Sequence, residues 1–317
     1  ILEEFRFPMS SLRLCASERS FGKKVTFGKQ TITIEGATRE LFSESDIVFF
    51  AAGGGVSKTL APVAAEEGAL VIDKSSTWRM DPSVPLVIPE INPEDIGSHQ
   101  GIISSPNCST IVMLMAIGPL HRSNPIKRII VDTYQSASGA GGKGILELDE
   151  QIRAVLAGKT PEHSTFPHSL AFNVLPHVEN FSDNDYTTEE MKMRDETRKI
   201  LHEPSLAVSA TCVRVPVPIS HSEAVHVEFS SPMTPKDARS LLAQAPGVIV
   251  VDDPANGKYP LAMDSAGRDE VFVGRIREDL AFDNGLSLWT VGDNLRKGAA
   301  TNAVQIAQEA LSQGALR

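Results

Sequence analysis

Short apolar runs alternate with helical stretches in the first part of the chain. The segment LRLCAS, which begins at Leu12, is followed by DIVFFAA, by a helical pattern from about Ser57 to Glu67, and by ALVID. The run from Asp46 to Ala52 is apolar on both faces, which is typical of a central strand in a parallel sheet. We therefore predict a doubly wound α/β domain of the dinucleotide-binding kind, in which ligands bind at the carboxyl ends of the strands.

The pattern of apolar positions changes after residue 107. Strands are predicted at 126–135, 207–217, 224–229, 271–277 and 286–291, and helices at about 145–156 and 187–201. This order of strands and helices predicts a mixed α+β second domain. The segment 295–311 has apolar residues at helical spacing and predicts a closing helix that packs on the first domain, whereas 252–267 is rich in Pro, Gly and Asn and predicts a loop. The predicted domains are 1–107 with 295–317, and 108–294.

The chain opens inside a predicted element. ILEEF is typical of the middle of an amphipathic helix and has neither the positive region nor the apolar core of a signal peptide. A dinucleotide-binding fold begins with a strand and a glycine-rich turn that holds the pyrophosphate. We find neither in this sequence, and we expect that the chain is an N-terminally truncated part of a longer protein.

Composition and charge narrow the class of protein. The 317 residues are 41% hydrophobic and 22% charged, which is a globular composition. A net charge of -10 argues against nucleic acid as the main partner. The apolar run from Ile111 to Leu120 is too short to cross a bilayer, so no membrane is expected. Three cysteines are too few and too scattered for a disulfide framework or a metal motif, which favours a reducing cytoplasm and a protein without a metal site.

The most informative segment is SSPNCSTI. Pro106 ends an extended run, Asn107 can cap a helix, and Cys108 then falls in the first turn of an apolar helix. The positive end of a helix favours the thiolate, which is the form that attacks a carbonyl. Cys15 and Cys212 lie within strand-like segments, and we expect both to be buried core residues.

A histidine and an arginine are candidate partners of this cysteine. His221 follows the interrupted strand PVPIS and should project from a strand end, whereas His226 belongs to the polar face of the next strand and should be solvated. Arg214 alternates with Val213 and Val215, so it should point away from their apolar face and meet water or an anion. Its planar fork suits a substrate carboxylate, and a structural salt bridge is the alternative.

Two glycine-rich segments and one serine-arginine segment are candidate cofactor contacts. The strand that ends at Gln135 continues into SASGAGGKG, whose backbone can approach a phosphate or a nicotinamide at Ser138 and Gly139. Gly53 and Gly54 end the second apolar run, where a doubly wound sheet binds its ligand. In ASERS an arginine is flanked by two serines, which favours a 2'-phosphate and hence NADP; these residues are Ser17, Arg19 and Ser20.

Five segments together resemble aspartate-β-semialdehyde dehydrogenases. They are SSTWRMDPSVPLVIPEIN, SSPNCSTI, YQSASGAG, CVRVPVPISHSEAV and GDNLRKGAATNAVQIA, and they occur in the family's order across nearly the whole chain. The resemblance implies the NADP-dependent conversion of aspartyl-4-phosphate to aspartate-4-semialdehyde and phosphate through a thioester, in lysine, threonine and methionine biosynthesis. It implies a cytoplasmic homodimer.

The resemblance also implies a role for each matching residue. Cys108 would be the nucleophile, Gln135 would position the reacting group, and His221 would be the acid-base residue. The implied substrate contacts are Arg79, Asn107, Glu189, Lys192 and Arg214, with Glu189 and Lys192 on one helix face. Asn294 of the GDNLRKG segment would join the cofactor contacts.

Three other functions remain open from the sequence. N-acetylglutamyl-phosphate reductase uses the same cysteine chemistry, but Glu189 offers a carboxylate to a free amino group and favours aspartyl phosphate. A cysteine hydrolase that uses Cys108 and His221 would need no cofactor, against which the glycine loops and Arg19 argue. A non-catalytic partner subunit without a cofactor is the third alternative.

Overall fold

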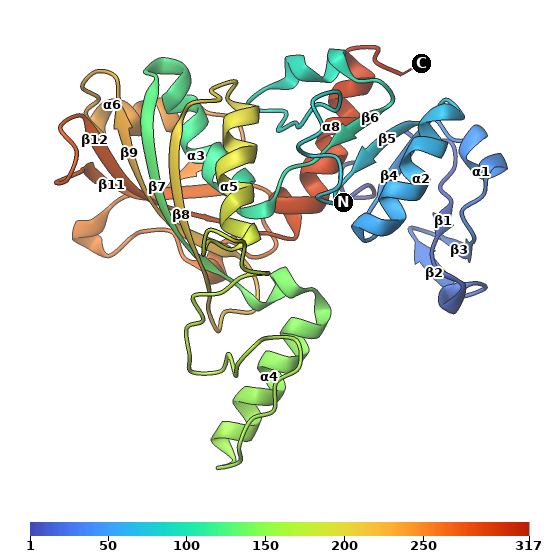
Figure 1. The fold of residues 1–317 in the computed structure, drawn as a ribbon, viewed down its shortest axis with the longest axis horizontal. Coiled ribbons are helices and arrows are strands. Elements are labelled where there is room, and N and C mark those ends of the chain that lie inside the picture. Colours follow the sequence, from blue (N-terminus) through green and yellow to red (C-terminus); the bar gives the residue numbers. More distant parts are fainter. Residues whose placement is uncertain (317) are drawn as a thin grey trace. The chain divides into compact units, whose positions relative to one another are not determined.

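The computed structural model describes residues 1–316, which form two compact units (Figure 1). The first unit comprises Ile1–Pro89, Pro93–Ser105 and the segment from Asn302 onward, and the second comprises Glu90–Asn92 and Pro106–Thr301. The boundaries between units therefore fall next to Pro106 and Asn302. The prediction that further residues precede Ile1 stays a prediction.

The first unit contains a three-stranded parallel sheet in the order β4-β5-β6. Its strands are β4 (Ile47–Phe50), β5 (Leu70–Asp73) and β6 (Ile102–Ser104). The predicted central strand at Asp46–Ala52 is wrong in its position, because β4 pairs with β5 alone and lies at the edge of this sheet, half-buried. An apolar run on both faces shows that a strand is covered, and it does not show how many strands flank it.

Helices cover this parallel sheet with two apolar clusters. α2 (Gly54–Glu66) begins three residues earlier than predicted and packs Ala61 and Ala64 with Val71. α8 (Thr301–Ser312) packs Ala303, Ile306 and Ala307 with Ile72 in the other cluster, at the spacing of one helix face. The predicted helix at 295–311 thus begins later than expected, because a π-helical turn, Arg296–Ala300, precedes it.

A second small sheet in the first unit has the order β1-β3-β2. β1 (Leu14–Cys15) is an edge strand, and β2 (Lys24–Phe27) and β3 (Gln30–Glu35) form a hairpin that the apolar pattern did not reveal. Cys15 is exposed, so the prediction of a buried core residue is wrong for it. A short helix, α1 (Arg39–Ser43), follows β3.

The opening segment forms a turn and no helix, contrary to prediction. The N–H of Phe5 donates to the carbonyl oxygen of Ile1 over 2.8 Å, but the pattern does not continue. Arg6 has a φ of 48°, a left-handed conformation that ends any helix at that point.

The second unit is built on a six-stranded mixed sheet, as the change of pattern predicts. The strand order is β10-β11-β12-β9-β7-β8, with β7 and β8 parallel and β9 antiparallel to β7. The strands are β7 (Ile126–Gln135), β8 (Ala207–Arg214), β9 (His221–Phe229), β10 (Val248–Val250), β11 (Val271–Glu278) and β12 (Gly285–Gly292). The helices that pack on this sheet are α3 (Cys108–Ser123), α5 (Thr188–Ile200) and α6 (Pro235–Leu242).

Several boundaries and short elements in the second unit differ from prediction. The strand predicted to reach residue 217 ends at Arg214, and the next strand begins at His221 rather than at residue 224. The predicted loop at 252–267 contains a 3-10 turn, Pro254–Asn256, and a one-turn helix, α7 (Ala262–Ser265). α6 and β10 were not predicted, because both are short.

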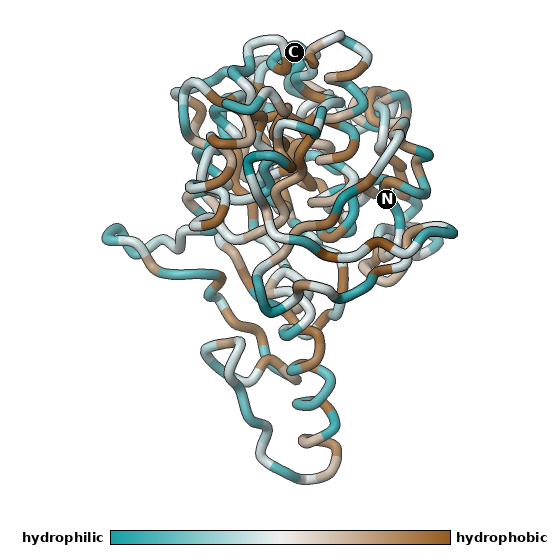
Figure 2. The backbone as a smooth tube through the Cα atoms, turned by 90° about the vertical axis from the view of Figure 1, so that its right-hand side faces the viewer, coloured by the Kyte–Doolittle hydropathy of each residue, from teal (hydrophilic) through white to brown (hydrophobic). Residues whose placement is uncertain are grey.

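An arm leaves the carboxyl end of β7 (Figure 1). After a 3-10 turn, Ala137–Ala140, it forms α4 (Gly142–Leu156), and hydrophilic and hydrophobic residues alternate along it (Figure 2). Leu148 packs with Phe166 and Leu170 of the returning segment, while Leu146 and Leu156 stay exposed. Within residues 1–316, no helix combines the length and apolarity needed to cross a membrane.

Candidate active site

Cys108 is the first residue of α3, where the sequence predicts a reactive thiol. Asn107 caps the helix, and its Oδ1 accepts hydrogen bonds from the N–H groups of Ser109 (3.0 Å) and Thr110 (3.2 Å). Most of the following helix is fully buried, so burial fixes its axis and its N-terminus. The half-buried thiol therefore lies at the positive end of a rigid helix.

Glu189 joins the predicted substrate residues in one network. Its carboxylate accepts from Nδ2 of Asn107 (3.0 Å to each oxygen) and from Nε2 of Gln135 (3.0 Å). Lys192 is 3.4 Å away on the next turn of α5, as the three-residue spacing predicts, and it also pairs with Glu179 at 2.5 Å. A capping box between Thr187 and Glu190 fixes the start of this helix. Glu189 is 3% exposed, so its carboxylate is held by these contacts and is almost fully shielded from solvent.

His221 is fully buried and presents a defined tautomer. Its Nδ1 accepts a hydrogen bond from the backbone N–H of Ser136 over 3.1 Å, so the proton of the neutral ring lies on Nε2. Burial, and then the charge of Arg214, hold the pKa of His221 well below its ordinary value of 6.5. Nε2 has no hydrogen-bond partner among residues 1–316. The site therefore offers one neutral N–H donor without a protein acceptor.

Arg214 lies on the face of β8 opposite to Val213, as predicted, but this face, which it shares with Ala210 and Cys212, is the buried one. Its Nη1 donates to the carbonyl oxygen of Ser136 over 2.7 Å. Burial lowers the pKa of Arg214, and the charges of Glu189 and Cys108 oppose this change. A guanidinium remains protonated in proteins, so the site holds a positive charge that interacts with Cys108.

The glycine-rich turn after β7 packs directly against these groups. A Cβ on Gly139 would lie 2.5 Å from Nη1 of Arg214 and 3.4 Å from Cε1 of His221. Oδ1 of Asn294 accepts from Oγ of Ser136 (3.1 Å), from Oγ of Ser138 (3.0 Å) and from the N–H of Ser220 (3.0 Å). Asn294 thereby ties the end of β12 to the backbone beside His221.

The predicted cofactor residues of the first unit lie at the ends of its strands. Arg19 is exposed in the 3-10 turn Glu18–Ser20 that follows β1, with Ser17 and Ser20 beside it, and it forms no ion pair in the described part of the chain. Gly53 is the N-cap of α2 and Gly54 its first residue, and no side chain caps this helix. Arg79 is also in this unit, where it donates to the carbonyl oxygens of Ser105 (3.0 Å) and Lys74 (2.9 Å).

Some residues of the site escaped the sequence analysis. Ser136, which contacts His221, Arg214 and Asn294, follows Gln135 in the glycine-rich segment and could have been noticed there. Glu196 accepts the backbone N–H of Asn107 over 2.6 Å, a contact across 89 positions that no local pattern indicates. Ser136 lies within the quoted segment YQSASGAG, whereas Glu196 lies in none of the five segments.

Two further expectations concern titratable residues beside the site. Cys212 is fully buried as predicted, and burial raises the pKa of its thiol well above 9.0. His226 shares the less buried face of β9 with Glu228, as predicted, and its side chain is 34% exposed; its Nδ1 lies 2.5 Å from Oδ2 of Asp279, a contact that was not predicted. Glu223, two residues after His221, is fully buried, and its carboxyl oxygens have no hydrogen-bond partner among residues 1–316.

Comparison with known proteins first defines a class. Residues 1–99 match the model of the semialdehyde dehydrogenase NAD binding domain, and residues 117–297 match that of the semialdehyde dehydrogenase dimerisation domain. Parallel-sheet and mixed-sheet domains of this kind are the predicted fold class, which is thereby confirmed. The fold and the family models define an oxidoreductase of the semialdehyde dehydrogenase class.

Full-length relatives narrow this class. Aspartate-semialdehyde dehydrogenase of Aquifex aeolicus (strain VF5) is 52% identical over 99% of this chain and 94% of its own length. The enzyme of that name from Bacillus subtilis (strain 168) is 47% identical over 97% and 91%. The crystal structure of aspartate semialdehyde dehydrogenase II complexed with ASA from Vibrio cholerae superposes with a TM-score of 0.95 at 46% identity, covering 98% of this chain and 93% of that chain. The chain belongs to the aspartate-semialdehyde dehydrogenase family.

Proposed function

We propose that this protein catalyses the reversible NADP-dependent reductive dephosphorylation of aspartyl-4-phosphate to aspartate-4-semialdehyde, with Cys108 as the nucleophile. The observation that carries the proposal is the position of Cys108. Its thiol begins a buried, Asn-capped helix and interacts with the positive charge of Arg214. A helix N-terminus and a cation both favour the thiolate, which is the nucleophilic form.

Charged groups of both signs near Cys108 match an amino acid substrate. Arg214 can bind the α-carboxylate with its remaining N–H groups, and Glu189 can accept the α-ammonium group. Glu189 already receives hydrogen bonds from Asn107 and Gln135, which support a negative charge at its carboxylate. Lys192 and Arg79 are the proposed ligands of the phosphate. A free ammonium ion at Glu189 favours aspartyl phosphate over an N-acylated substrate.

The chemistry follows from the placement of Cys108 and His221. The thiolate attacks the acyl carbon, a carbon–sulfur bond forms, and the carbon–oxygen bond to phosphate breaks, which leaves a thioester. After reduction of the thioester carbon, the carbon–sulfur bond breaks and releases the aldehyde and the thiolate. The N–H at Nε2 of His221 can donate to the oxyanion that forms at each tetrahedral stage, because no acceptor among residues 1–316 competes for it.

The first unit fits a phosphate-bearing dinucleotide. Gly53 and Gly54 leave the N-terminus of α2 without a side-chain cap, so its N–H groups and positive dipole end are open to a phosphate. Arg19, an exposed cation between two serines, suits a 2'-phosphate and thus NADP over NAD. Ser138, Gly139 and Asn294 of the second unit would hold the nicotinamide end. When bound, the reduced cofactor supplies the hydride.

We infer that the protein acts as a homodimer. The match to the dimerisation domain model covers most of the second unit. On β7, Ile130 and Tyr134 are more than a third exposed, and they alternate with the buried Ile129 and Val131, so one face of this strand is left for a partner. Sedimentation equilibrium would show a single species of twice the chain mass, and a monomer at working concentration would contradict the inference.

The proposed reaction is tested by measuring the rate of cofactor reduction under several matched conditions. Aspartate semialdehyde, phosphate and NADP are mixed with the protein, and formation of reduced cofactor is followed with and without phosphate. Phosphate-dependent reduction should be present in the protein and in Cys15→Ala, because Cys15 is exposed in the first unit, and it should be lost in Cys108→Ala. A parallel assay uses N-acetylglutamate semialdehyde.

The alternatives give different results in this assay. Turnover of the N-acetylated aldehyde in place of aspartate semialdehyde would assign the related reductase activity. Hydrolysis without NADP would assign a cysteine hydrolase. A folded protein that binds NADP and reduces it with neither aldehyde would refute the proposed substrate.

A further inference from the structure

Lys297 is a fully buried lysine that the proposed reaction does not use. Its Nζ lies 2.6 Å from Oε2 of Glu90, whose side chain is 11% exposed. Burial lowers the pKa of Lys297, and the carboxylate of Glu90 opposes this change. Buried ion pairs are weak sources of stability, because the loss of hydration offsets most of the attraction, and their best-attested use is to specify one arrangement. A role in positioning therefore explains the Glu90–Lys297 pair better than a contribution to stability does.

The turn that carries Lys297 forms a wall of the thiol site. Lys297 lies in the π-helical turn Arg296–Ala300, and such turns are rare and occur frequently at functional sites. A Cβ on the next residue, Gly298, would lie only 3.1 Å from Cβ and 3.5 Å from Cα of Cys108. The N–H of Gly298 donates to the carbonyl oxygen of Asp293 over 3.0 Å. Any shift of this turn thus changes the space around Cys108.

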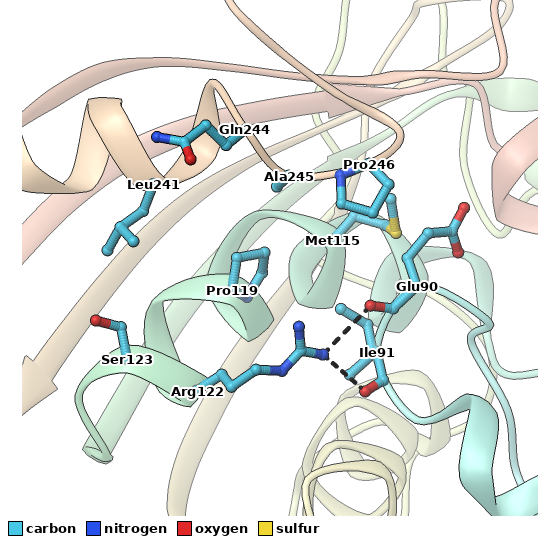
Figure 3. A pocket seen from close by; sticks show the side chains of 10 residues that line it. All are labelled: Glu90, Ile91, Met115, Pro119, Arg122, Ser123, Leu241, Gln244, Ala245 and Pro246. Carbon is cyan, nitrogen blue, oxygen red and sulfur yellow. Dashed lines mark hydrogen bonds between the residues drawn. The ribbon is translucent and has the colours of Figure 1, made fainter.

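Glu90 is anchored on the other side of the pair. Nη2 of Arg122, near the C-terminus of α3, donates to the carbonyl oxygens of Glu90 (3.4 Å) and Ile91 (3.0 Å), as the dashed lines in Figure 3 show. Gly247 packs closely here, since a Cβ on it would lie 3.4 Å from Oε1 of Glu90. Glu90 is therefore fixed relative to α3, the helix that begins at Cys108.

The Glu90 side chain also lines a cavity of about 340 Å³. In Figure 3 its carboxylate stands beside Met115 and Pro246, with Pro119 of α3 across the cavity. A cavity of this size admits small molecules. Small solutes can therefore reach the position of the Glu90 carboxylate.

We propose that Glu90 and Lys297 are positioning residues, whose ion pair clamps the π-helical turn to α3 and holds Gly298 against the reactive thiol. The proposal rests on Cys108 being the nucleophile. Because the clamp acts on the thiol itself, its loss changes the reactivity of Cys108 before any substrate binds. A purely structural pair would change the unfolding temperature and leave this reactivity intact.

The first test removes both charges together. The double variant Glu90→Gln/Lys297→Met avoids an unpaired buried charge, and it is expected to fold with a similar unfolding temperature. Alkylation of Cys108 by iodoacetamide should be about tenfold to 10²-fold slower in this variant than in the wild type, or kcat should be lower by that factor. A displacement of a reacting group by about 1 Å has effects of this size. The matched control is Arg239→Met/Asp252→Asn, which removes the 2.6 Å ion pair between α6 and Asp252 and should leave the rate unchanged.

The second test is chemical rescue through the cavity. Glu90→Ala removes the carboxylate and leaves room for acetate beside Lys297, so added sodium acetate should restore the alkylation rate in a saturable manner. Sodium chloride at the same ionic strength should not, and Glu90→Gln, which leaves no such room, should not respond to acetate.

The outcomes separate this inference from the proposed function. A folded double variant whose Cys108 reacts and turns over as in the wild type overturns the clamp, and so does a slow Glu90→Ala variant that acetate fails to restore. If Glu90→Ala does not fold, the double variant decides alone. If wild-type Cys108 reacts no faster than the exposed Cys15, the assignment of the nucleophile fails instead.

Discussion

Replacing Gly139 by alanine should displace Arg214 and weaken substrate binding. The new Cβ would lie 2.5 Å from Nη1 of Arg214, whereas ordinary contact begins at 3.4 Å, so the guanidinium must move by at least 0.9 Å (3.4 minus 2.5). Arg214 is buried and its Nη1 donates to the carbonyl oxygen of Ser136 over 2.7 Å, so this movement strains or breaks that bond. The perturbation is thus aimed at the cation proposed to bind the substrate carboxylate.

The magnitude follows from the displacement. Misplacement of a catalytic or binding group by about 1 Å costs about 10²-fold in rate, which corresponds to about 2.7 kcal/mol. Steady-state kinetics with aspartate semialdehyde should show this loss in kcat/KM, with the larger share in KM. The unfolding temperature should fall little, because the backbone of the turn is kept.

Gly142→Ala is the matched control from the same glycine-rich segment. A Cβ on Gly142 meets no atom within 4 Å, and the residue begins α4. Alanine there should leave the kinetics unchanged and raise stability by up to about 1 kcal/mol, because alanine favours a helix over glycine. If Gly139→Ala showed the kinetics of Gly142→Ala, Arg214 would not be the carboxylate ligand and the reasoning would be refuted.

Substitutions at three other residues test the core, the helix cap and the cofactor site in turn. Burial raises the pKa of Glu223 in the folded protein well above 4.5. Above about pH 4.5 the unfolded chain therefore releases a proton that the folded protein retains. The free energy of unfolding should then fall by about 1.4 kcal/mol per pH unit until the pH reaches the pKa of Glu223 in the folded protein. Glu223→Gln should remove this slope in urea titrations from acid to neutral pH, and a slope like that of the wild type would contradict the assignment. Asn107→Asp keeps the cap but sets a second buried carboxylate 3.0 Å from Glu189, so KM for aspartate semialdehyde should rise and the unfolding temperature should fall; an unchanged KM would count against Glu189 as the amino-group ligand. Arg19→Ala should raise KM for NADP by about tenfold, the effect of one charge-assisted hydrogen bond, and leave KM for NAD unchanged; an equal rise for both would exclude a 2'-phosphate contact.

The strands of the second unit were predictable because each has one covered face. The predicted strand at 126–135 coincides with β7, in which buried and exposed residues alternate along much of its length. The strand at 46–52 was found but misplaced in the sheet, because strand order depends on pairing between distant segments. The predicted strand-like segment LRLCAS contains β1, whereas the β2–β3 hairpin is mostly exposed, so burial left no pattern to detect there.

The site was predictable where its signals are local. Pro106, Asn107 and Cys108 stand together, and the cap and the helix start follow from adjacent residues. The burial of Arg214 was not predictable, because Val213 beside it is only half-buried and the alternation gives no sign of which face is the core. The pair of Glu90 and Lys297 joins positions 207 apart, and only the folded chain brings them together.

The tautomer of His221 limits which proton transfers this residue can perform in the proposed reaction. Because a backbone N–H from Ser136 occupies Nδ1, the neutral ring already carries its proton on Nε2 and cannot accept one there from the thiol. Its low pKa also disfavours the doubly protonated ring. In the proposed mechanism, activation of Cys108 would therefore come from the N-terminus of α3 and the charge of Arg214. We propose that His221 donates a hydrogen bond to the oxyanion, in place of the acid-base role that the resemblance implies. It follows that His221→Asn, which keeps an N–H donor, should retain more turnover than His221→Ala, and that both variants should keep the alkylation rate of Cys108.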